Sequence, residues 1–148
     1  MGGSTKEESH EAMYRLEDAI NSTRSAIEEG IVIGAGMALY NISKKLDTLI
    51  KGKTDLDYIV GIKALQTALQ EPARQIINNT GNNGDVILSK LKEGQVYNAM
   101  TNEIVDPFKA GIIDPLKVER VSLKNTVSMV GLFMITDAVV SKYVETIK

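Results

Sequence analysis

The stretch LEDAINSTRSAIEEGIVIGAG, from Leu16 to Gly36, decides the fold that we expect for this chain. Its first half continues an apolar stripe that begins at Met13, with apolar side chains three and four residues apart, which is the pattern of an amphipathic helix. Gly30 is placed to end that helix, because glycine is common just after the last helical residue. The apolar connector 31–33 and the turn at 34–36 lead directly into a second apolar segment. The sequence therefore predicts two helices joined by a glycine-rich turn.

Helical patterns cover most of the remaining chain. The second segment predicts a helix over 37–49, and the last long pattern, from 116 to 135, is nearly all apolar after Val127. We therefore expect this last helix to be the most buried one, with Met129 and Met134 filling the core. Asp114 followed by Pro115 is typical of a capping acid with proline at the first helical position. Further helices are expected at about 7–28, 56–69, 72–79 and 86–92. The tail 136–148 is expected to be a helix extension or a strand. In the helix over 37–49, the residues expected to face inward are Leu39, Ile42, Leu46 and Leu49.

One segment has a different pattern. Val96 and Tyr97 are followed by turn-forming residues, and then by Glu103, Ile104 and Val105. Two short runs rich in β-branched and aromatic residues around such a turn predict a β-hairpin. The expected fold class is thus all-α, or mainly helical, with one small β-hairpin near residues 95–106.

Composition excludes several classes of protein. The chain has 148 residues, a net charge of −2, one histidine and no cysteine. Such a length predicts one domain, and the charge lacks the basic field of a nucleic-acid-binding protein. Because the chain has no cysteine, it has no disulfide framework, and because it has one histidine, a His-based metal site or catalytic triad is improbable. No run is apolar and long enough for a membrane span. We expect no nucleic acid, no membrane and no protein-bound metal as partners of this segment.

Single motifs have ordinary explanations. Gly34-Ala35-Gly36 is not a dinucleotide fingerprint, because Leu39 stands where the third glycine belongs, and a tight turn between helices explains it equally well. Asp18 lies two residues past Leu16, about 200° round the helix from the apolar stripe, where most acids are simply solvated. Asn98 suits a hairpin turn.

The order of the motifs is more specific than any one of them. After the acidic helix come Glu-Glu-Gly-Ile-Val at 28–32, the glycine turn at 34–36, Gly-Ile-Lys-Ala-Leu at 61–65 and Pro-Ala-Arg-Gln-Ile at 72–76. Tyr-Asn-Ala at 97–99 and Gly-Ile-Ile-Asp-Pro-Leu-Lys-Val at 111–118 follow. In this order, the chain resembles the C-terminal part of group I (GroEL-type) chaperonins, from about Gly2 to Lys142. The resemblance implies that residues 1–28 are the C-terminal arm of the intermediate, or hinge, domain and that residues 29–148 are the C-terminal half of the equatorial ATPase domain.

The resemblance also implies site residues. Asp18 matches the catalytic aspartate, which positions and activates the water that attacks the γ-phosphate. The matches on the nucleotide side are Gly34, Ala35 and Gly36 against the ribose and base, Asn98 and Met100 at the adenine, Ile112 packing on the base and Asp114 at the ribose hydroxyls. Ala35 replaces the glycine usual in the family, and Met100 replaces a smaller residue.

The implied cofactor is ATP. Its Mg²⁺ and K⁺ would be bound mainly by an N-terminal half, because the family's Gly-Asp-Gly-Thr-Thr-Thr loop has no counterpart here. The implied partners are other chaperonin subunits in a double ring and, through an apical domain, unfolded polypeptide clients and a co-chaperonin. The implied location is the bacterial cytoplasm or an organelle matrix. We therefore expect a fragment of an ATP-dependent chaperonin that is inactive by itself. The alternatives are a free-standing helical interaction module or a truncated paralogue without ATPase activity.

Overall fold

A computed structural model describes residues 5–141, and it is mainly helical with two small antiparallel sheets. The first sheet pairs β1 (Ile31–Ile33) with β4 (Ile113–Pro115), and the second pairs β2 (Val96–Asn98) with β3 (Glu103–Val105). The expected fold class and the expected hairpin are both confirmed. The helices are α1 (Lys6–Glu29), α2 (Met37–Lys45), α3 (Asp47–Ile50), α4 (Leu56–Ala68), α5 (Glu71–Asn78), α6 (Gly84–Lys90), α7 (Pro107–Ala110) and α8 (Leu116–Met134).

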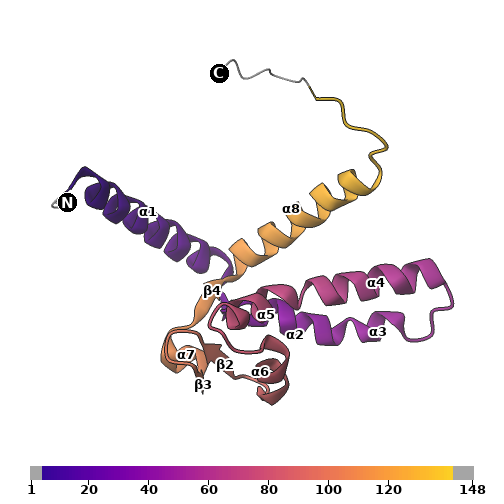
Figure 1. Cartoon of the computed structure of the whole chain (residues 1–148), viewed down its shortest axis with the longest axis horizontal. Helices are drawn as coiled ribbons and strands as arrows, with labels where there is room; N and C mark the ends of the chain where they lie inside the picture. The colour runs from indigo at the N-terminus through magenta and orange to yellow at the C-terminus, as the bar shows by residue number, and fades with distance from the viewer. Residues whose placement is uncertain (1–4, 142–148) are drawn as a thin grey trace.

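The molecule consists of a body and two arms. The body comprises residues 31–115, and α1 and α8 leave it as separate arms from the two strands of the β1–β4 ribbon (Figure 1). Within the body, α3 and α4 lie side by side and extend away from the ribbon, while α6, α7 and the hairpin gather below α5 (Figure 1). The two arms are thus anchored at one point, the ribbon.

The core lies inside the body. Val96 and Tyr97 of β2 are 0% and 3% exposed and belong to the same cluster as Ile77 of α5 and Leu88 of α6. Successive residues of a strand point to opposite faces, so both faces of β2 are covered here. The Tyr97 hydroxyl donates to Asn102 Oδ1 at 2.6 Å and accepts from Asn82 Nδ2 at 2.8 Å, so its polar end is satisfied although the ring is buried. The clustered buried side chains are Met37, Tyr40, Ala73, Ile77, Leu88, Val96 and Tyr97.

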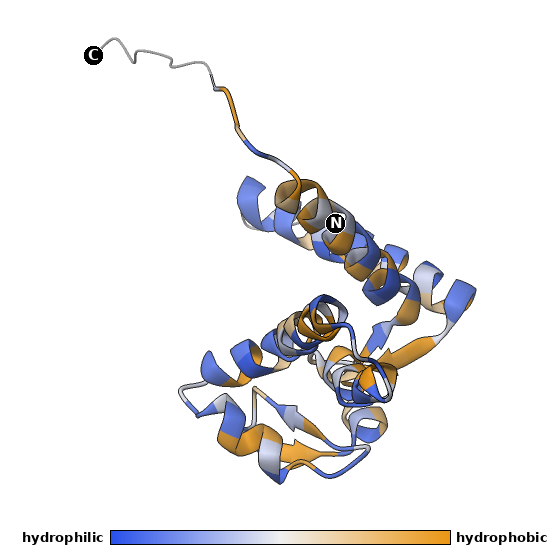
Figure 2. Ribbon diagram, turned by 90° about the vertical axis from the view of Figure 1, so that its right-hand side faces the viewer, coloured by the Kyte–Doolittle hydropathy of each residue, from blue (hydrophilic) through white to orange (hydrophobic). Residues whose placement is uncertain are grey.

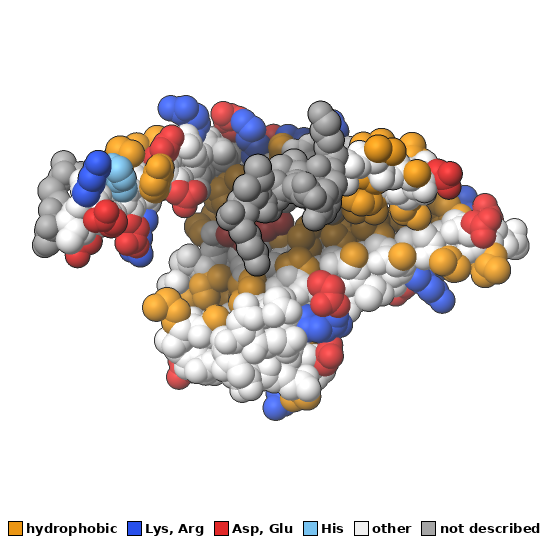
Figure 3. Space-filling view, turned by 45° about the horizontal axis from the view of Figure 1, so that its top comes forward, with side chains coloured by type: hydrophobic (Ala, Val, Ile, Leu, Met, Phe, Trp, Pro, Cys, Tyr) orange, Lys and Arg blue, Asp and Glu red, His pale blue; other side chains and the backbone are white. Residues whose placement is uncertain are grey.

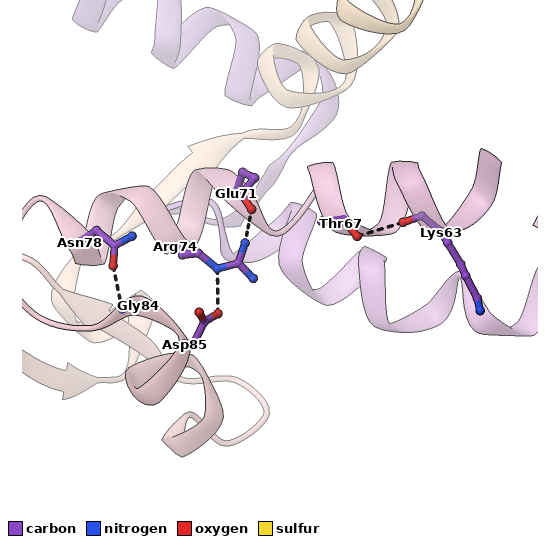
Figure 4. A network of polar contacts seen from close by, with 7 residues as sticks. All are labelled: Lys63, Thr67, Glu71, Arg74, Asn78, Gly84 and Asp85. Atoms are coloured by element: carbon purple, nitrogen blue, oxygen red, sulfur yellow. Dashed lines mark hydrogen bonds and ion pairs between the residues drawn. The ribbon is translucent and has the colours of Figure 1, made fainter. Parts of the chain in front are cut away.

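Polar contacts fasten α5 to α6. Arg74 of α5 binds Glu71 on its own helix, and its Nε donates to Asp85 Oδ1 at 2.8 Å (Figure 4). One turn further along, Asn78 Oδ1 accepts from the backbone N–H of Gly84 at 2.8 Å (Figure 4). These contacts fix the loop 79–83 between the two helices.

The β1–β4 ribbon is an element that the sequence analysis missed. The segment 31–33 was expected as a simple connector, yet Ile31, Val32 and Ile33 pair with Pro115, Asp114 and Ile113. A three-residue strand has too little alternation to be recognised, and its partner lies some eighty residues further along the chain. The ribbon matters because it brings the glycine turn beside Asp114.

The expectation that α8 is the most buried helix is wrong. Within the described chain α8 has no buried residue, and Val130, Leu132 and Phe133 are all at least half exposed. Met129 and Met134 are exposed rather than core residues. The pattern correctly indicates an apolar helix, and hydrophobic residues recur along the helical arm that leads to the C-terminus (Figure 2). This helix, however, contacts mainly α1 and β4. Residues 136–141 form neither the expected helix nor a strand, and 142–148 lie outside the described residues.

Two local expectations are also wrong. Asp114 does not cap α8, because it belongs to β4 and the helix starts after Pro115 without a side-chain cap. The helix expected over 37–49 breaks at Leu46, whose N–H bonds the Ser43 carbonyl three residues back. Gln66 of α4 also donates to that carbonyl, at 3.1 Å, and so stabilises the break. Ile42 and Leu49, which were expected to face inward, are 46% and 47% exposed, and α2 instead buries Met37, Tyr40 and Ser43.

Candidate functional site

The glycine turn lies directly against Asp114 and Ile112. The N–H of Gly34 donates to the Ile112 carbonyl at 3.0 Å, which continues the β1–β4 pairing by one residue. A Cβ at Gly34 would lie 3.1 Å from Asp114 Oδ2 and 3.1 Å from the carbonyl carbon of Ile112. Gly34 is therefore a close-approach glycine. The structure thus brings together three residues that the sequence analysis selected from positions almost eighty residues apart.

Ala35 and Gly36 complete the turn in the left-handed conformation. Their φ angles are 56° and 72°, and Gly36 is the N-cap residue of α2. A Cβ at Gly36 would lie 2.6 Å from the backbone nitrogen of Ala73, so glycine is needed here for packing against α5. Among residues 5–141, the backbone N–H groups of Ala35 and Gly36 donate no hydrogen bond. Ala35 is half-buried and Gly36 is buried, so the N–H of Ala35 belongs to the more exposed of the two residues.

Asp114 is a half-buried carboxylate beside this turn. Its side chain makes no hydrogen bond or ion pair to any described residue. Glu119, one turn into α8, is close enough to sense its charge: burial raises the pKa of Glu119, and the charge of Asp114 raises it further. The site therefore presents an unpaired acceptor next to two unpaired backbone donors.

The hairpin residues are not joined to this turn. Asn98 Oδ1 accepts from the backbone N–H of Met100 at 2.9 Å and of Thr101 at 3.4 Å, so this oxygen holds the hairpin turn. Met100 lies at the tip and is 93% exposed. No hydrogen bond within the described residues links either side chain to the glycine turn.

Asp18 lies far from the glycine turn. It is exposed on α1, twelve residues before Gly30, which corresponds to about 18 Å of helix. In Figure 1 this helix runs away from the body. The structure therefore leaves Asp18 apart from Gly34, Ile112 and Asp114.

Two ion pairs fix the base of α1 to α8, and the sequence analysis did not identify them. Lys117 binds Glu28, and Arg120 binds both carboxylate oxygens of Glu29, at 2.9 Å through Nε and 2.5 Å through Nη2. The hydrogen bond from Arg120 lowers the pKa of Glu29, against the opposing effect of desolvation. The sequence did contain a signal for these ion pairs: Glu28 and Glu29 lie at the C-terminal end of α1, where acids oppose the helix dipole and favour cationic partners.

A cavity of about 540 Å³ lies beside the turn, between α2 and residues 91–94. Ile33 and Met37, which bracket the turn, line this cavity, and Lys44, Lys45 and Lys92 contribute its cations. Asp114 pairs with Val32 rather than with Ile33, so its side chain lies on the other face of the ribbon. The cavity and the Asp114 side of the turn are therefore distinct.

Two further kinds of site were searched for in residues 5–141. That part of the chain contains no group of three or more His, Cys, Asp or Glu side chains arranged to hold a metal ion. It also has no helix with the length and apolar character of a membrane span.

Comparison with protein-family models gives a match that covers almost the whole chain. The matched residues are 1–143, and the model is that of the TCP-1/cpn60 chaperonin family. The match includes α1, the glycine turn, the hairpin and the β4–α8 junction described above. The chain therefore belongs to the TCP-1/cpn60 chaperonin family, whose role is in protein folding.

Proposed function

We propose that this chain supplies the base and ribose side of the ATP site of a group I chaperonin subunit, with Asp18 as the catalytic carboxylate. Residues 1–28 would form the returning arm of the intermediate domain, and residues 29–148 the C-terminal half of the equatorial domain. The observation that carries the proposal is the convergence of Gly34, Ile112 and Asp114 across the β1–β4 ribbon.

The local chemistry suits a nucleoside. The unpaired Asp114 carboxylate is an acceptor for two ribose hydroxyls, and charged acceptors make stronger hydrogen bonds than neutral ones. The free N–H group of Ala35 can donate to ribose or phosphate oxygens at the start of α2. Ile112 is half-buried beside the core and offers an apolar surface to a base.

Asp18 requires movement of α1 to act. A carboxylate that accepts a hydrogen bond from water can orient and activate that water for attack on a phosphoryl group. The exposed Asp18 has this capacity, but α1 must swing about its attachment to the ribbon to bring it near a bound nucleotide. Such a swing would couple hydrolysis to a conformational change of the subunit.

The remaining parts of the proposal concern cofactors and partners. Mg²⁺ and K⁺ would be held with the phosphates by other parts of the subunit. Chaperonin subunits would be the assembly partners, as family membership suggests, and the double ring, the clients and the co-chaperonin would follow from the group I assignment. The compartment would be bacterial cytoplasm or an organelle matrix.

The test uses a complete subunit that carries this segment. Asp18→Ala should leave nucleotide binding intact and reduce ATP turnover at least about a hundredfold, as expected for loss of a positioned base. Glu17→Ala, at the adjacent exposed carboxylate, is the matched control and should turn over normally. Asp114→Asn should instead weaken nucleotide binding. Wild-type turnover by Asp18→Ala would refute the catalytic assignment, and unchanged nucleotide affinity in Asp114→Asn would refute the ribose assignment.

One observation favours a second candidate, a helical interaction module without ATPase activity. Both arms expose apolar side chains, including Ile20 of α1 and Leu132 and Phe133 of α8. Exposed apolar faces of this extent are typical of protein–protein contact surfaces. Size-exclusion chromatography with light scattering and a thermal melt of the 148-residue chain separate the two candidates: a well-behaved monomer or dimer with a cooperative melt supports the module, and a partly molten or aggregating chain argues against it.

A further inference from the structure

The body is rich in asparagine on the side that carries α6 and the hairpin. Six of the nine asparagines of the chain lie between Asn78 and Asn102. Figure 3 shows this lower part of the body as mostly white, the colour of uncharged polar side chains and of the backbone. Asparagine is among the thermolabile residue types, because its side-chain amide can be lost to water. The surface around α6 is therefore where this kind of chemistry is concentrated.

One dipeptide in this region is especially labile. The chain contains a single Asn-Gly pair, Asn83–Gly84, where the loop after α5 enters α6. Amide loss begins when the backbone nitrogen of the next residue attacks the asparagine Cγ. Glycine favours that attack, because it has no Cβ to obstruct the approach. Asn83 is also exposed, so water can reach its side chain.

Packing against α5 requires glycine at position 84. A Cβ there would lie 2.8 Å from both Cγ and the carbonyl oxygen of Arg74, and 3.0 Å from Asn78 Oδ1. Contacts this short leave no room for a side chain. The close approach of α6 to α5 thus makes the susceptible pair a structural necessity as long as Asn83 precedes it.

Two hydrogen bonds hold the reacting groups in the folded chain. The N–H of Gly84 donates to Asn78 Oδ1 at 2.8 Å, so α5 holds this nitrogen (Figure 4). Asn83 Oδ1 accepts from the backbone N–H of Val86 at 3.2 Å, which fixes the side chain that would be attacked. The nitrogen must give up its proton before it can attack, so the hydrogen bond to Asn78 has to open first.

An ion pair beside this contact also fastens α6. Arg74 Nε donates to Asp85 Oδ1 at 2.8 Å, and Glu71 binds the same guanidinium (Figure 4). Because Gly84 is buried between these contacts and Asn78, its nitrogen becomes free only when α6 detaches from α5. Such local opening costs less free energy than unfolding of the whole body.

We propose that Asn83 is a deamidation site that reacts only when α6 detaches from α5, and that the hydrogen bond between Asn78 and Gly84 sets its rate. The Gly84 nitrogen forms a bond to Asn83 Cγ while its proton passes to hydroxide, and the Cγ–Nδ2 bond breaks to release ammonia. Water then opens the cyclic imide at either carbonyl, which leaves aspartate or isoaspartate at position 83. The proposal is independent of the ATP site.

The two products differ in their effect on the loop. Aspartate caps a helix about as well as asparagine, so it preserves the contact with Val86. Isoaspartate instead carries the chain through its side-chain carbon, which adds a methylene group to the backbone before Gly84 and displaces that residue from Asn78. Because ammonia is lost to solvent, the conversion is irreversible, and its extent measures the time that α6 has spent detached.

Peptide mapping by mass spectrometry tests the proposal on the 148-residue chain, by following conversion at position 83 at mildly alkaline pH. The folded chain should convert at least about tenfold more slowly than the same chain in concentrated urea, because reaction then requires local opening. Asn78→Ala should speed conversion of the folded chain at least about fivefold, through loss of one hydrogen bond. Asn78→Asp should stay close to the wild-type rate, because a carboxylate oxygen can still accept from Gly84.

The matched control is the neighbouring asparagine. Asn79→Ala should leave the conversion rate unchanged, since the Asn79 side chain accepts from Gln75 and makes no contact with Gly84. A folded wild-type chain that converts as fast as the chain in urea overturns the proposal. A wild-type rate in Asn78→Ala, or equal acceleration in Asn79→Ala, overturns it as well.

Amide hydrogen exchange keeps the test decisive if Asn78→Ala loosens the whole chain. In that variant, exchange at Gly84 should rise by the same factor as the conversion, while exchange in the buried strand β2 should stay at its wild-type rate. Equal acceleration in β2 would mean that global unfolding sets the rate, and would contradict the role assigned to Asn78.

Discussion

The body and the arms carry the same kind of apolar pattern but bury it to opposite degrees. In the body, α5 buries Ala73 and Ile77 at 1% and 2% exposed against α6 and the hairpin. In the arms, neither α1 nor α8 has a buried residue, although α1 carries a clear apolar stripe and the second half of α8 is almost entirely apolar. The comparison teaches that periodicity identifies the face of a helix that needs a partner, while tertiary structure decides whether the partner is present.

The difference has consequences for local stability. Helices in proteins gain most of their stability from tertiary packing of an amphipathic face, and such packing is absent over most of each arm. The arms should therefore open at lower free energy than the body. The most direct test of this difference in stability is to remove an apolar side chain from the body and another from an arm, and to compare the losses.

The largest expected effect is in the body. Ile77→Ala should reduce the free energy of unfolding by about 2–5 kcal/mol, because the side chain is 2% exposed and its removal leaves a cavity. Leu132→Ala in α8 is the matched control and should change it by less than about 0.5 kcal/mol, since Leu132 is 58% exposed and alanine is a good helix former. Urea denaturation followed by circular dichroism measures both. Equal losses would mean that α8 is covered in solution.

The next effect concerns the junction of α2 and α5. Gly36→Ala should destabilise the chain by about 1–3 kcal/mol more than Gly52→Ala, because its Cβ would lie 2.6 Å from the backbone nitrogen of Ala73. Gly52 has a similar φ, 76° against 72°, but nothing within 4 Å of its Cβ position. The pair therefore separates the clash from the left-handed strain that both variants share. Equal losses in urea denaturation would contradict a packing role for Gly36.

The sequence predicted those elements whose signals are local. The C-terminal end of α1 at Gly30, the start of α4 after Asp55 and the hairpin around Asn98 all follow from caps, turn residues or periodicity within a short window. The sequence did not predict the β1–β4 ribbon or the break at Leu46, because they depend on partners far away in sequence, Ile113–Pro115 and Gln66. Such partners leave no trace in the periodicity of the segment itself.

The candidate site also has a part that could be predicted from the sequence and a part that could not. The resemblance selected Gly34, Ile112 and Asp114 together, and the structure brings them into contact through the ribbon. The resemblance could not indicate that α1 holds Asp18 away from these residues, because the orientation of an arm is set by contacts at its base. Glu119 was also missed, since an acid in an apolar helix has no distinctive signal until its surroundings are known.

A smaller effect is expected at the turn that connects the body to its ribbon. Ala35 has φ 56°, a conformation that costs a residue with a Cβ about 1–2 kcal/mol. Ala35→Gly should therefore stabilise the chain by up to about 1 kcal/mol, after the entropic cost of glycine is subtracted. Ala64→Gly, inside α4, is the control and should reduce the free energy of unfolding of the chain by about 1 kcal/mol. A loss of stability in Ala35→Gly would show that the methyl group contributes more by packing than it costs by strain.

The smallest effect is at the base of the arms and should depend on pH. Because the pKa of Glu29 is lowered in the folded chain, its ion pair with Arg120 stabilises the fold above the usual glutamate pKa of 4.5, and that contribution is lost as the pH falls through the lowered value. Arg120→Ala should therefore lower the melting temperature slightly near neutral pH and not at all well below 4.5, and should speed hydrogen exchange at the C-terminal end of α1. Arg15→Ala removes an ion pair that lies within α1 and should leave that exchange unchanged. A pH-independent difference would mean that Arg120 joins the arms by packing of its aliphatic stem rather than by charge.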